Sequence, residues 1–284
     1  MQDAAAKTNR SYRRVPPKPG STRETFDALG ILKVIHRRIK DTIFAKVQFP
    51  DYLQGSLKGC DYVSNARKHV NQQILICEDV KKFFPSVQAV NIEDVWCALF
   101  GFSLPVAKLL TQLTTKDGSM PQGAITSSYL ANLVLWRDEP LLHAKMAQKG
   151  ITYSRYVDDM VMSSKSHLSK SEQAWAIAQV YGMLRKNGLL AGRNKHEIFS
   201  ATRPMVATKL IVNRKPSLPH KKRSQIRAQV RQLEQSVASN LESGTLVELA
   251  AKAAQSVGQL GRFHPNQAGH LKSRIQAVRA RCRL

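Results

Sequence analysis

The spacing of hydrophobic residues changes several times along the chain, and each change predicts a different element. Between residues 21 and 44, apolar side chains recur every three or four positions, which is typical of an amphipathic helix: Leu29, Leu32, Ile35, Ile39 and Ile43. Residues 74–77 form an unbroken apolar run, typical of a buried strand, that ends at Glu78 and Asp79. Residues 151–164 indicate a strand, a tight turn and a returning strand.

Later segments predict further helices and one strand pair. A helix is expected with Ser169 or Ser171 as its N-cap, and two short strands are expected to pair around Ile198 and residues 210–212. From Arg214 onward the pattern is mostly helical, and 14 Lys and Arg stand against three Glu. We therefore predict a basic N-terminal arm, a mixed core and a helical C-terminal region: residues 1–20, 21–215 and 216–284.

The chain of 284 residues has a net charge of +24, since 44 Lys and Arg outnumber 20 Asp and Glu. An excess of this size indicates a polyanionic partner, nucleic acid before an anionic membrane. No apolar run approaches the roughly 18 residues of a membrane span, and the N-terminus lacks the apolar core of a signal peptide. We therefore expect a cytoplasmic protein with no membrane partner. The four scattered cysteines predict reduced thiols and no zinc site.

Asp158 and Asp159 place two adjacent carboxylates at the predicted hairpin turn. Two buried like charges are unfavourable unless one is protonated or a cation offsets them, and a hard divalent cation prefers carboxylate oxygens. The competing interpretation is an acidic surface turn. Asp79 supplies a third carboxylate at a strand end that is remote in sequence. Three such carboxylates favour a metal-dependent phosphoryl-transfer site over the acidic turn.

Four short motifs occur in a fixed order along the chain: NARKHV at residues 65–70, then LICEDVKKFFPSV, MPQGAITSSYLANL and YVDD. In this order they resemble the motifs of reverse transcriptases, most closely the bacterial retron and group II intron type. YxDD alone is a weak signal, whereas four ordered motifs are specific, and the resemblance covers nearly the whole chain. It implies an α+β right-hand polymerase with fingers and palm (residues 21–215), built from an antiparallel sheet and helices, followed by a helical thumb (residues 216–284).

The resemblance also implies an activity and a metal site. The enzyme would be an RNA-directed DNA polymerase that extends a primer on an RNA template with dNTPs. Asp79 and Asp158 would hold two Mg²⁺ ions, with Mn²⁺ as an alternative metal. Asp159 would assist, and the carbonyl of Val80 would complete the ligand shell.

The incoming nucleotide is expected between motif residues. Phe84 would lie beneath the sugar and exclude a 2′-hydroxyl, while Phe83 is expected in the core. Gln122 would touch the nucleotide, and Gly123 would let the backbone approach closely. Lys18 and Arg23 would grip the triphosphate, and Lys195 would protonate or neutralise the pyrophosphate. A core aromatic, a plain turn and a solvated basic face are the competing interpretations of these residues.

The resemblance implies further contacts with nucleic acid. Tyr156 would lie against the primer end, and Asn65 and His69 of the NAxxH signature would also contact nucleic acid. In the C-terminal region, basic residues repeat every fourth position beside an apolar helix face: Arg223, Arg227 and Arg231. Such a stripe can follow a phosphate backbone. The alternative is a solvated face on which Glu234 pairs with Arg227 or Arg231.

Retron-type enzymes imply a structured non-coding RNA as template and primer, an RNA-linked DNA product, an effector protein and a role in antiphage defence. The sequence departs from the retron pattern at Lys209, where the VTG element has Gly, and at Ser128, where the family often has Pro. These departures leave the polymerase interpretation intact but weaken the assignment to a standard retron, and three alternatives stay open. They are a defence-associated or group II intron-derived reverse transcriptase without a retron RNA, an RNA-dependent RNA polymerase, and a non-catalytic RNA-binding protein with the polymerase fold.

Overall fold

The computed structural model describes residues 8, 11–17, 20, 23–238 and 243–282. The chain divides into two compact units, Met1–Thr208 and Lys209–Leu284, which we call unit 1 and unit 2. The predicted boundary lay a few residues later, after residue 215. Much of the predicted N-terminal arm lies outside the described residues. Among the helices that are described, none combines the length and the apolar character that a membrane span requires.

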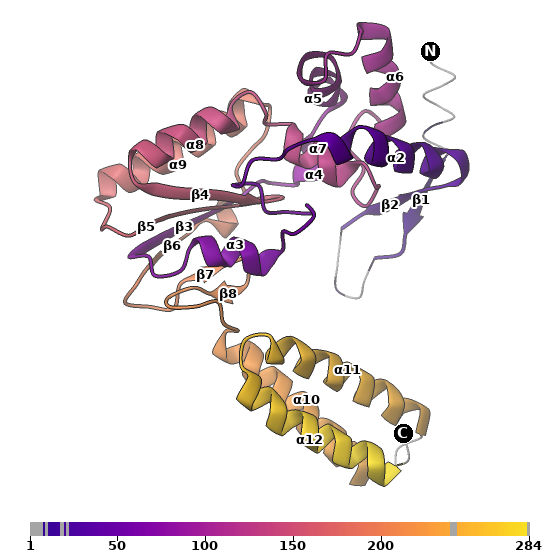
Figure 1. Cartoon of the computed structure of the whole chain (residues 1–284), viewed down its shortest axis with the longest axis vertical. Helices are drawn as coiled ribbons and strands as arrows, with labels where there is room; N and C mark the ends of the chain where they lie inside the picture. The colour runs from indigo at the N-terminus through magenta and orange to yellow at the C-terminus, as the bar shows by residue number, and fades with distance from the viewer. Residues whose placement is uncertain (1–7, 9–10, 18–19, 21–22, 239–242, 283–284) are drawn as a thin grey trace. The chain divides into compact units, whose positions relative to one another are not determined.

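A four-stranded antiparallel sheet forms the centre of unit 1 (Figure 1). Its strands lie in the order β4, β5, β3 and β6: Ile151–Tyr156, Asp159–Ser164, Ile74–Asp79 and Glu197–Ser200. The apolar run before Asp79 is buried, as its unbroken pattern predicts. The predicted pairing of the Ile198 segment with residues 210–212 is wrong, because Ile198 pairs with Ile76 of β3.

Helices cover both faces of this sheet, with α8 and α9 on one side and α3 on the other (Figure 1). The α-helices of unit 1 are α2 (Gly30–Thr42), α3 (Tyr62–Lys68), α4 (Phe83–Ser86), α5 (Ala89–Asp94), α6 (Leu104–Thr114), α7 (Ser127–Leu133), α8 (Glu139–Gln148) and α9 (Lys170–Lys186). Helix α5 continues into a π-helical turn, η2 (Val95–Leu99), and two 3₁₀ turns are η1 (Phe44–Lys46) and η3 (Arg193–Lys195). Ser169 caps α9 in a capping box with Glu172, which confirms one of the two predicted caps.

The core of unit 1 continues from the sheet into a cluster of aromatic rings. Phe44 stacks on Trp96 and on Tyr129, with ring centroids 5.4 and 5.1 Å apart. A separate hairpin, β1 (Tyr12–Val15) and β2 (Thr25–Ala28), lies beside α2. The last strand of unit 1 is β7 (Val206–Ala207). All four cysteines are free thiols, as their scattered positions predict.

Unit 2 begins with β8 (Leu210–Ile211) and consists mainly of three helices: α10 (His220–Ala238), α11 (Ser243–Gly261) and α12 (Pro265–Cys282). The apolar positions of α10 are buried as their spacing predicts: Ile226, Val230 and Leu233. Glu234 pairs with Arg274 of α12 at 2.8 and 2.6 Å, and not with a neighbour on its own helix. Lys209, which replaces the Gly of the retron pattern, has φ +70°, a conformation in which Gly is the usual residue.

Candidate active site

Backbone pairing brings the three predicted aspartates to one end of the central sheet. Asp79 ends β3 directly opposite Asp159, which begins β5. Asp158 lies in the turn before β5, and its carbonyl oxygen accepts a hydrogen bond from the amide of Val80 at 3.0 Å. Because these contacts are all part of the sheet or its immediate continuation, residues about 80 positions apart in sequence meet at one edge.

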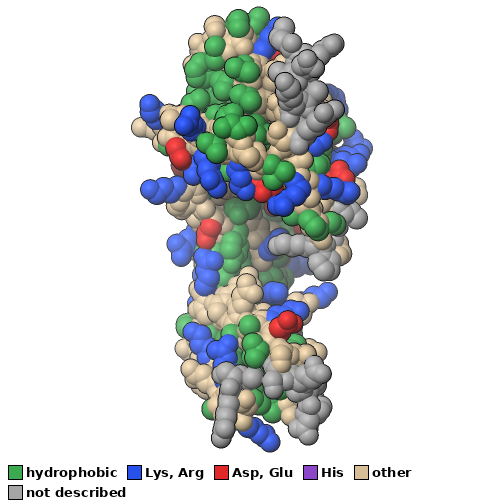
Figure 2. All heavy atoms as spheres, turned by 90° about the vertical axis from the view of Figure 1, so that its right-hand side faces the viewer, with side chains coloured by type: hydrophobic (Ala, Val, Ile, Leu, Met, Phe, Trp, Pro, Cys, Tyr) green, Lys and Arg blue, Asp and Glu red, His purple; other side chains and the backbone are tan. Residues whose placement is uncertain are grey.

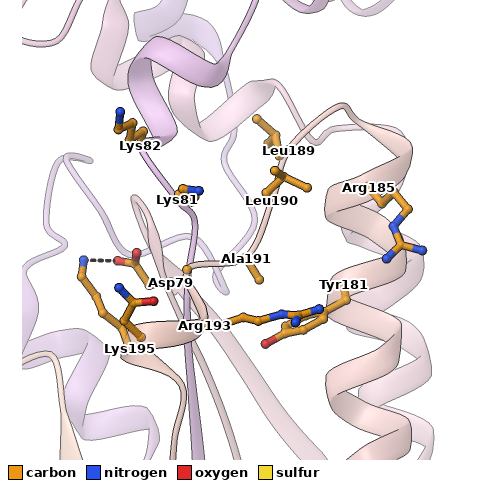
Figure 3. A pocket seen from close by; sticks show the side chains of 12 residues that line it. Asp79, Lys81, Lys82, Tyr181, Arg185, Leu189, Leu190, Ala191, Arg193 and Lys195 are labelled. Atoms are coloured by element: carbon orange, nitrogen blue, oxygen red, sulfur yellow. Dashed lines mark hydrogen bonds and ion pairs between the residues drawn. The ribbon is translucent and has the colours of Figure 1, made fainter.

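The Asp79 carboxylate is largely covered, with 5% of the residue exposed. The ammonium of Lys195 lies 2.6 Å from Oδ1, the contact that Figure 3 marks with a dashed line. The amide of Gly192 donates to the carbonyl of Asp79 at 2.7 Å, and a Cβ at Gly192 would lie 2.8 Å from Oδ2. A side chain at position 192 would therefore press against this carboxylate.

The electrostatics of the pair follow from burial and contact. Burial raises the pKa of the Asp79 carboxyl above its ordinary value, although Lys195 acts in the opposite direction. The hydrogen bond to Asp79 raises the pKa of Lys195, so the ammonium form is favoured. Burial therefore favours the protonated form of Asp79, and a neighbouring cation favours the charged form.

The donor set of this edge fits a hard divalent cation. It offers carboxylate oxygens from Asp79, Asp158 and Asp159, and a protein cation already neutralises one of them. Across the described part of the chain, no three or more His, Cys, Asp or Glu side chains are already arranged so that they could hold a metal ion. A metal ion would therefore require the carboxylates to gather and Lys195 to leave Asp79.

A basic cavity of about 560 Å³ opens beside Asp79. Figure 3 shows Arg185 reaching it from α9, and Arg193 lying alongside Tyr181. Four cations besides Lys195 line the cavity: Lys81, Lys82, Arg185 and Arg193. Such a lining suits a ligand with several phosphate charges.

The predicted nucleotide loop is built against the β1–β2 hairpin. The carbonyl of Gln122 accepts a hydrogen bond from the amide of Phe26 at 2.7 Å. Gly123 has φ +103°, and a Cβ there would lie 2.9 Å from the carbonyl oxygen of Phe26. The close approach at Gly123 is thus to another backbone segment. Phe83 is buried in the core as predicted, whereas Phe84 is half-buried beside it.

The other predicted triphosphate and primer contacts differ in their placement. Arg23 is exposed before β2, and its charge opposes the rise in the pKa of Asp79 that burial causes. Tyr156 ends β4 and is half-buried, with its hydroxyl pKa raised by burial. Lys18 lies outside the described residues.

Asn65 and His69 were predicted to contact nucleic acid, but the structure buries both side chains completely. His69 bridges β4 and β5, with Nε2 2.7 Å from Ser154 Oγ and Nδ1 2.7 Å from Ser163 Oγ. Ser154 in turn donates to Asn65 Oδ1 at 2.7 Å. Burial lowers the pKa of His69 to about 3, so the imidazole is neutral. The motif therefore ties α3 to β4 and β5.

On α10, Arg227 and Arg231 are exposed and Arg223 is half-buried. Figure 2 shows one face of the molecule, on which Lys and Arg side chains are widespread and acidic ones are few. This distribution agrees with the excess of positive charge in the sequence. It is the electrostatic pattern expected of a surface for nucleic acid.

Sequence reasoning missed Arg155, a completely buried residue of β4 that forms an ion pair with Glu139. The available signal was a single charged residue inside a predicted strand, directly before the YVDD motif. It also missed Glu78, which is buried on the opposite face of β3 and bonded by Tyr181 and His196.

Comparison with known proteins gives a consistent result. The profile of the family described as reverse transcriptase (RNA-dependent DNA polymerase) matches residues 15–243. The chain is 30% identical to the retron Se72 reverse transcriptase of Salmonella heidelberg, over 94% of this chain and 73% of that protein. It is 27% identical to the retron Ec48 reverse transcriptase of Escherichia coli, over 95% of this chain and 69% of that protein.

Among solved structures, the chain is similar to telomerase from Candida albicans in complex with a TWJ fragment of telomeric RNA. The TM-score is 0.50 and the identity 9%, over 99% of this chain and 65% of that chain. At this identity the likeness concerns the fold alone. It confirms the predicted α+β right-hand polymerase fold.

Proposed function

The chain belongs to the reverse transcriptase family and is a retron-type RNA-directed DNA polymerase, and from this premise we propose that Asp79, Asp158 and Asp159 form its catalytic centre. The observation that carries the proposal is the register of the central sheet, in which Asp79 lies opposite Asp159. The bond between Asp158 and Val80 supports it, because it joins the YVDD turn to β3.

Enzymes of this family use divalent metal ions. We assign the ions here as two Mg²⁺, for which Mn²⁺ could substitute, held by Asp79 and Asp158 with help from Asp159 and the carbonyl of Val80. When bound, the ions lower the pKa of the attacking hydroxyl and stabilise charge on the leaving oxygen. For this binding, Lys195 has to release Oδ1 of Asp79, and its exposed position gives it room to turn away.

The remaining residues position the substrates. In this proposal Phe84 excludes a sugar 2′-hydroxyl and so selects dNTPs, and Gln122 with Gly123 contacts the incoming nucleotide. The cations Lys18, Arg23 and Lys195 offset charge on the triphosphate, and Tyr156 supports the primer end. The 3′ hydroxyl then attacks the α-phosphate in line and pyrophosphate leaves, so that positioning and charge stabilisation supply most of the catalysis.

The nucleic-acid partner follows from the retron-type family and from the charge. We propose a structured non-coding RNA that serves as template and primer, with its cDNA as product, in bacterial cytoplasm. Residues 21–215 act as fingers and palm and residues 216–284 as the thumb, where Arg223, Arg227 and Arg231 follow the phosphate backbone. A role in antiphage defence with an effector protein completes this proposal.

Primer extension on an RNA template with dNTPs and Mg²⁺ tests the catalytic assignment. Asp79→Asn and Asp158→Asn should each reduce extension by more than about 10³-fold, because a neutral amide stabilises much less positive charge. Binding of labelled RNA should stay unchanged. Asp51→Asn, at an exposed aspartate paired with Lys68, is the matched control. Normal extension by both active-site variants would refute the assignment.

The same assay tests the sugar gate. Phe84→Ala removes the ring that excludes the 2′-hydroxyl, so incorporation of rNTPs relative to dNTPs should rise by about tenfold or more, the change expected for one removed steric clash. Phe83→Leu, in the adjacent core position, should leave the ratio unchanged. An unaltered ratio in Phe84→Ala would remove Phe84 from this role.

A further inference from the structure

Arg155 is a buried guanidinium in which every hydrogen-bond donor has a partner. Nε and Nη2 donate to the two carboxylate oxygens of Glu139 at 2.6 and 2.7 Å. Nη1 donates to the carbonyls of Ala131 and Val157 at 2.9 and 3.1 Å, and Nη2 also donates to the carbonyl of Asn132 at 3.1 Å. These five bonds account for all five N–H groups of an arginine.

The charges of Arg155 and Glu139 are opposite to the partial charges of the helix ends that they contact. The carbonyls of Ala131 and Asn132 belong to the last turn of α7, where a helix accumulates partial negative charge. Glu139 begins α8, where partial positive charge accumulates. The cation therefore lies at the negative end of one helix and the anion at the positive end of the next, which offsets the penalty of burying them.

The bond from Arg155 to Val157 reaches the turn that carries Asp158. Val157 has φ +61°, a left-handed conformation that is unfavourable for a β-branched residue. Its side chain packs against Gly55, where a Cβ would lie 2.5 Å from it. Asn132 donates to the carbonyl of Gly55 at 2.9 Å. The contacts thus close a ring from α7 through Gly55 and Val157 to Arg155 and back to α7.

We propose that Arg155 is a positioning residue that fixes the strained Val157 turn, and with it Asp158 and Asp159, against helix α7. The same helix follows the loop of Gln122 and Gly123, so Arg155 sets the distance between the aspartates and the nucleotide loop. This inference deepens the proposed function and rests on it. Its effect is on the reaction step, because a misplacement near 1 Å can lower a rate by about 100-fold.

A purely structural ion pair is the competing explanation, and the two can be separated. Replacing a buried ion pair with apolar residues of similar volume is often neutral for stability. The double variant Arg155→Met with Glu139→Met therefore removes the bonds to α7 and to Val157 while it keeps the space filled. If the pair has only a structural role, the folded molecules of this variant should have wild-type activity.

The experiment measures single-nucleotide addition, RNA binding and thermal unfolding for the full chain. The double variant should lose about 10- to 100-fold in kcat, with KM for dNTP and RNA affinity unchanged within about twofold. Adding Val157→Gly should recover at least part of the loss, since glycine adopts φ +61° without support. Arg137→Met, at an exposed arginine that forms two bonds with Asp94, is the matched control and should behave as wild type.

Wild-type kcat in the folded double variant overturns the proposal, and so does a failure of Val157→Gly to recover any activity. If the double variant does not fold, Arg155→Lys replaces it, because lysine keeps the charge but cannot make the forked bonds. The same loss in kcat is then expected, and its absence overturns the proposal. Asp79→Asn is measured in parallel. Activity in Asp79→Asn refutes the proposed catalytic centre. If Asp79→Asn is inactive and the Arg155 variant is fully active, only the positioning role of Arg155 is refuted.

Discussion

Two groups of cations differ in what neutralises them. One lies in unit 1 near the end of the central sheet that carries Asp79, and the other lies on helix α10 of unit 2. Arg155 is completely buried and bonded to protein acceptors, and Lys195 contacts Asp79. On α10, Arg227 and Arg231 are exposed, in a region that has 14 Lys and Arg but only three Glu. A buried charge requires a partner within the protein, whereas an exposed excess is balanced by mobile ions or by a polyanion. The first group therefore fixes geometry, and the second is available for binding.

Among the tests of this comparison, the basic stripe of α10 gives the largest expected effect. Replacing Arg223, Arg227 and Arg231 with Gln should weaken RNA–DNA binding by roughly 100-fold at physiological salt, because three phosphate contacts release their counterions. The slope of log affinity against log salt should fall by about two to three. Fluorescence anisotropy with a labelled duplex at several salt concentrations measures both quantities. The control replaces the same residues with Lys, which keeps the charge and should keep the slope. A full slope in the Gln variant would mean that the stripe is only a solvated face.

His69 is a second buried group with hydrogen-bond partners inside the protein, and its burial predicts a pH dependence of stability. Its pKa is about 3 in the folded protein and near 6.5 when exposed, so only the unfolded chain binds a proton between these values. Stability is therefore lost as pH falls below about 6.5, with a slope of about 1.4 kcal/mol per pH unit from this group.

In the variant His69→Gln, the free energy of unfolding should change less steeply with pH between pH 6 and 4, by up to about 1.4 kcal/mol per pH unit. Urea titrations followed by tryptophan fluorescence report on unit 1, which contains all three tryptophans: Trp96, Trp136 and Trp175. His36 has its own pKa lowered by burial and remains in the variant, so part of the slope will persist. Equal slopes in the two proteins would show that His69 is protonated in the folded state.

Lys195 gives the smallest effect, since its side chain is 55% exposed and the ion pair is screened by solvent. Lys195→Gln removes the ammonium that competes for Oδ1 of Asp79, so half-maximal extension should need about two- to fivefold less Mg²⁺. A Mg²⁺ titration of primer extension measures this. Lys186→Gln, at a lysine that pairs with Asp138, is the control. An unchanged Mg²⁺ requirement would mean that Lys195 does not compete with the metal.

Local patterns in the sequence were sufficient to predict the strands that gather the aspartates. The run at residues 74–77 ends at Asp79 because a buried strand ends where charge begins, and YVDD reads as a turn because two carboxylates rarely lie within a strand. Both features are local, so they can be recognised without knowledge of the partners. The order of the motifs then identified the polymerase fold that the structural comparison confirms.

Partners remote in sequence could not be predicted in the same way. The NAxxH motif was expected to contact nucleic acid because it resembles the retron signature, yet Ser154 and Ser163 bond His69 in the interior. The strand at Ile198 was assigned to its sequence neighbour, whereas β3 offered a free edge. Arg155 looked like any charged residue, because nothing nearby in the sequence shows that Glu139 lies within hydrogen-bond distance.

The closed set of bonds around Arg155 also constrains how this enzyme can evolve. A substitution at position 155 alone leaves Glu139 in the interior without a cationic partner, and a substitution at position 139 alone leaves the guanidinium without an anionic one. Either single step passes through a less stable protein, so the two positions should covary across homologues. Because Asn132, Gly55 and Val157 are bonded or packed into the same ring, sequence variation in the catalytic turn should depend on residues of the helix after the nucleotide loop.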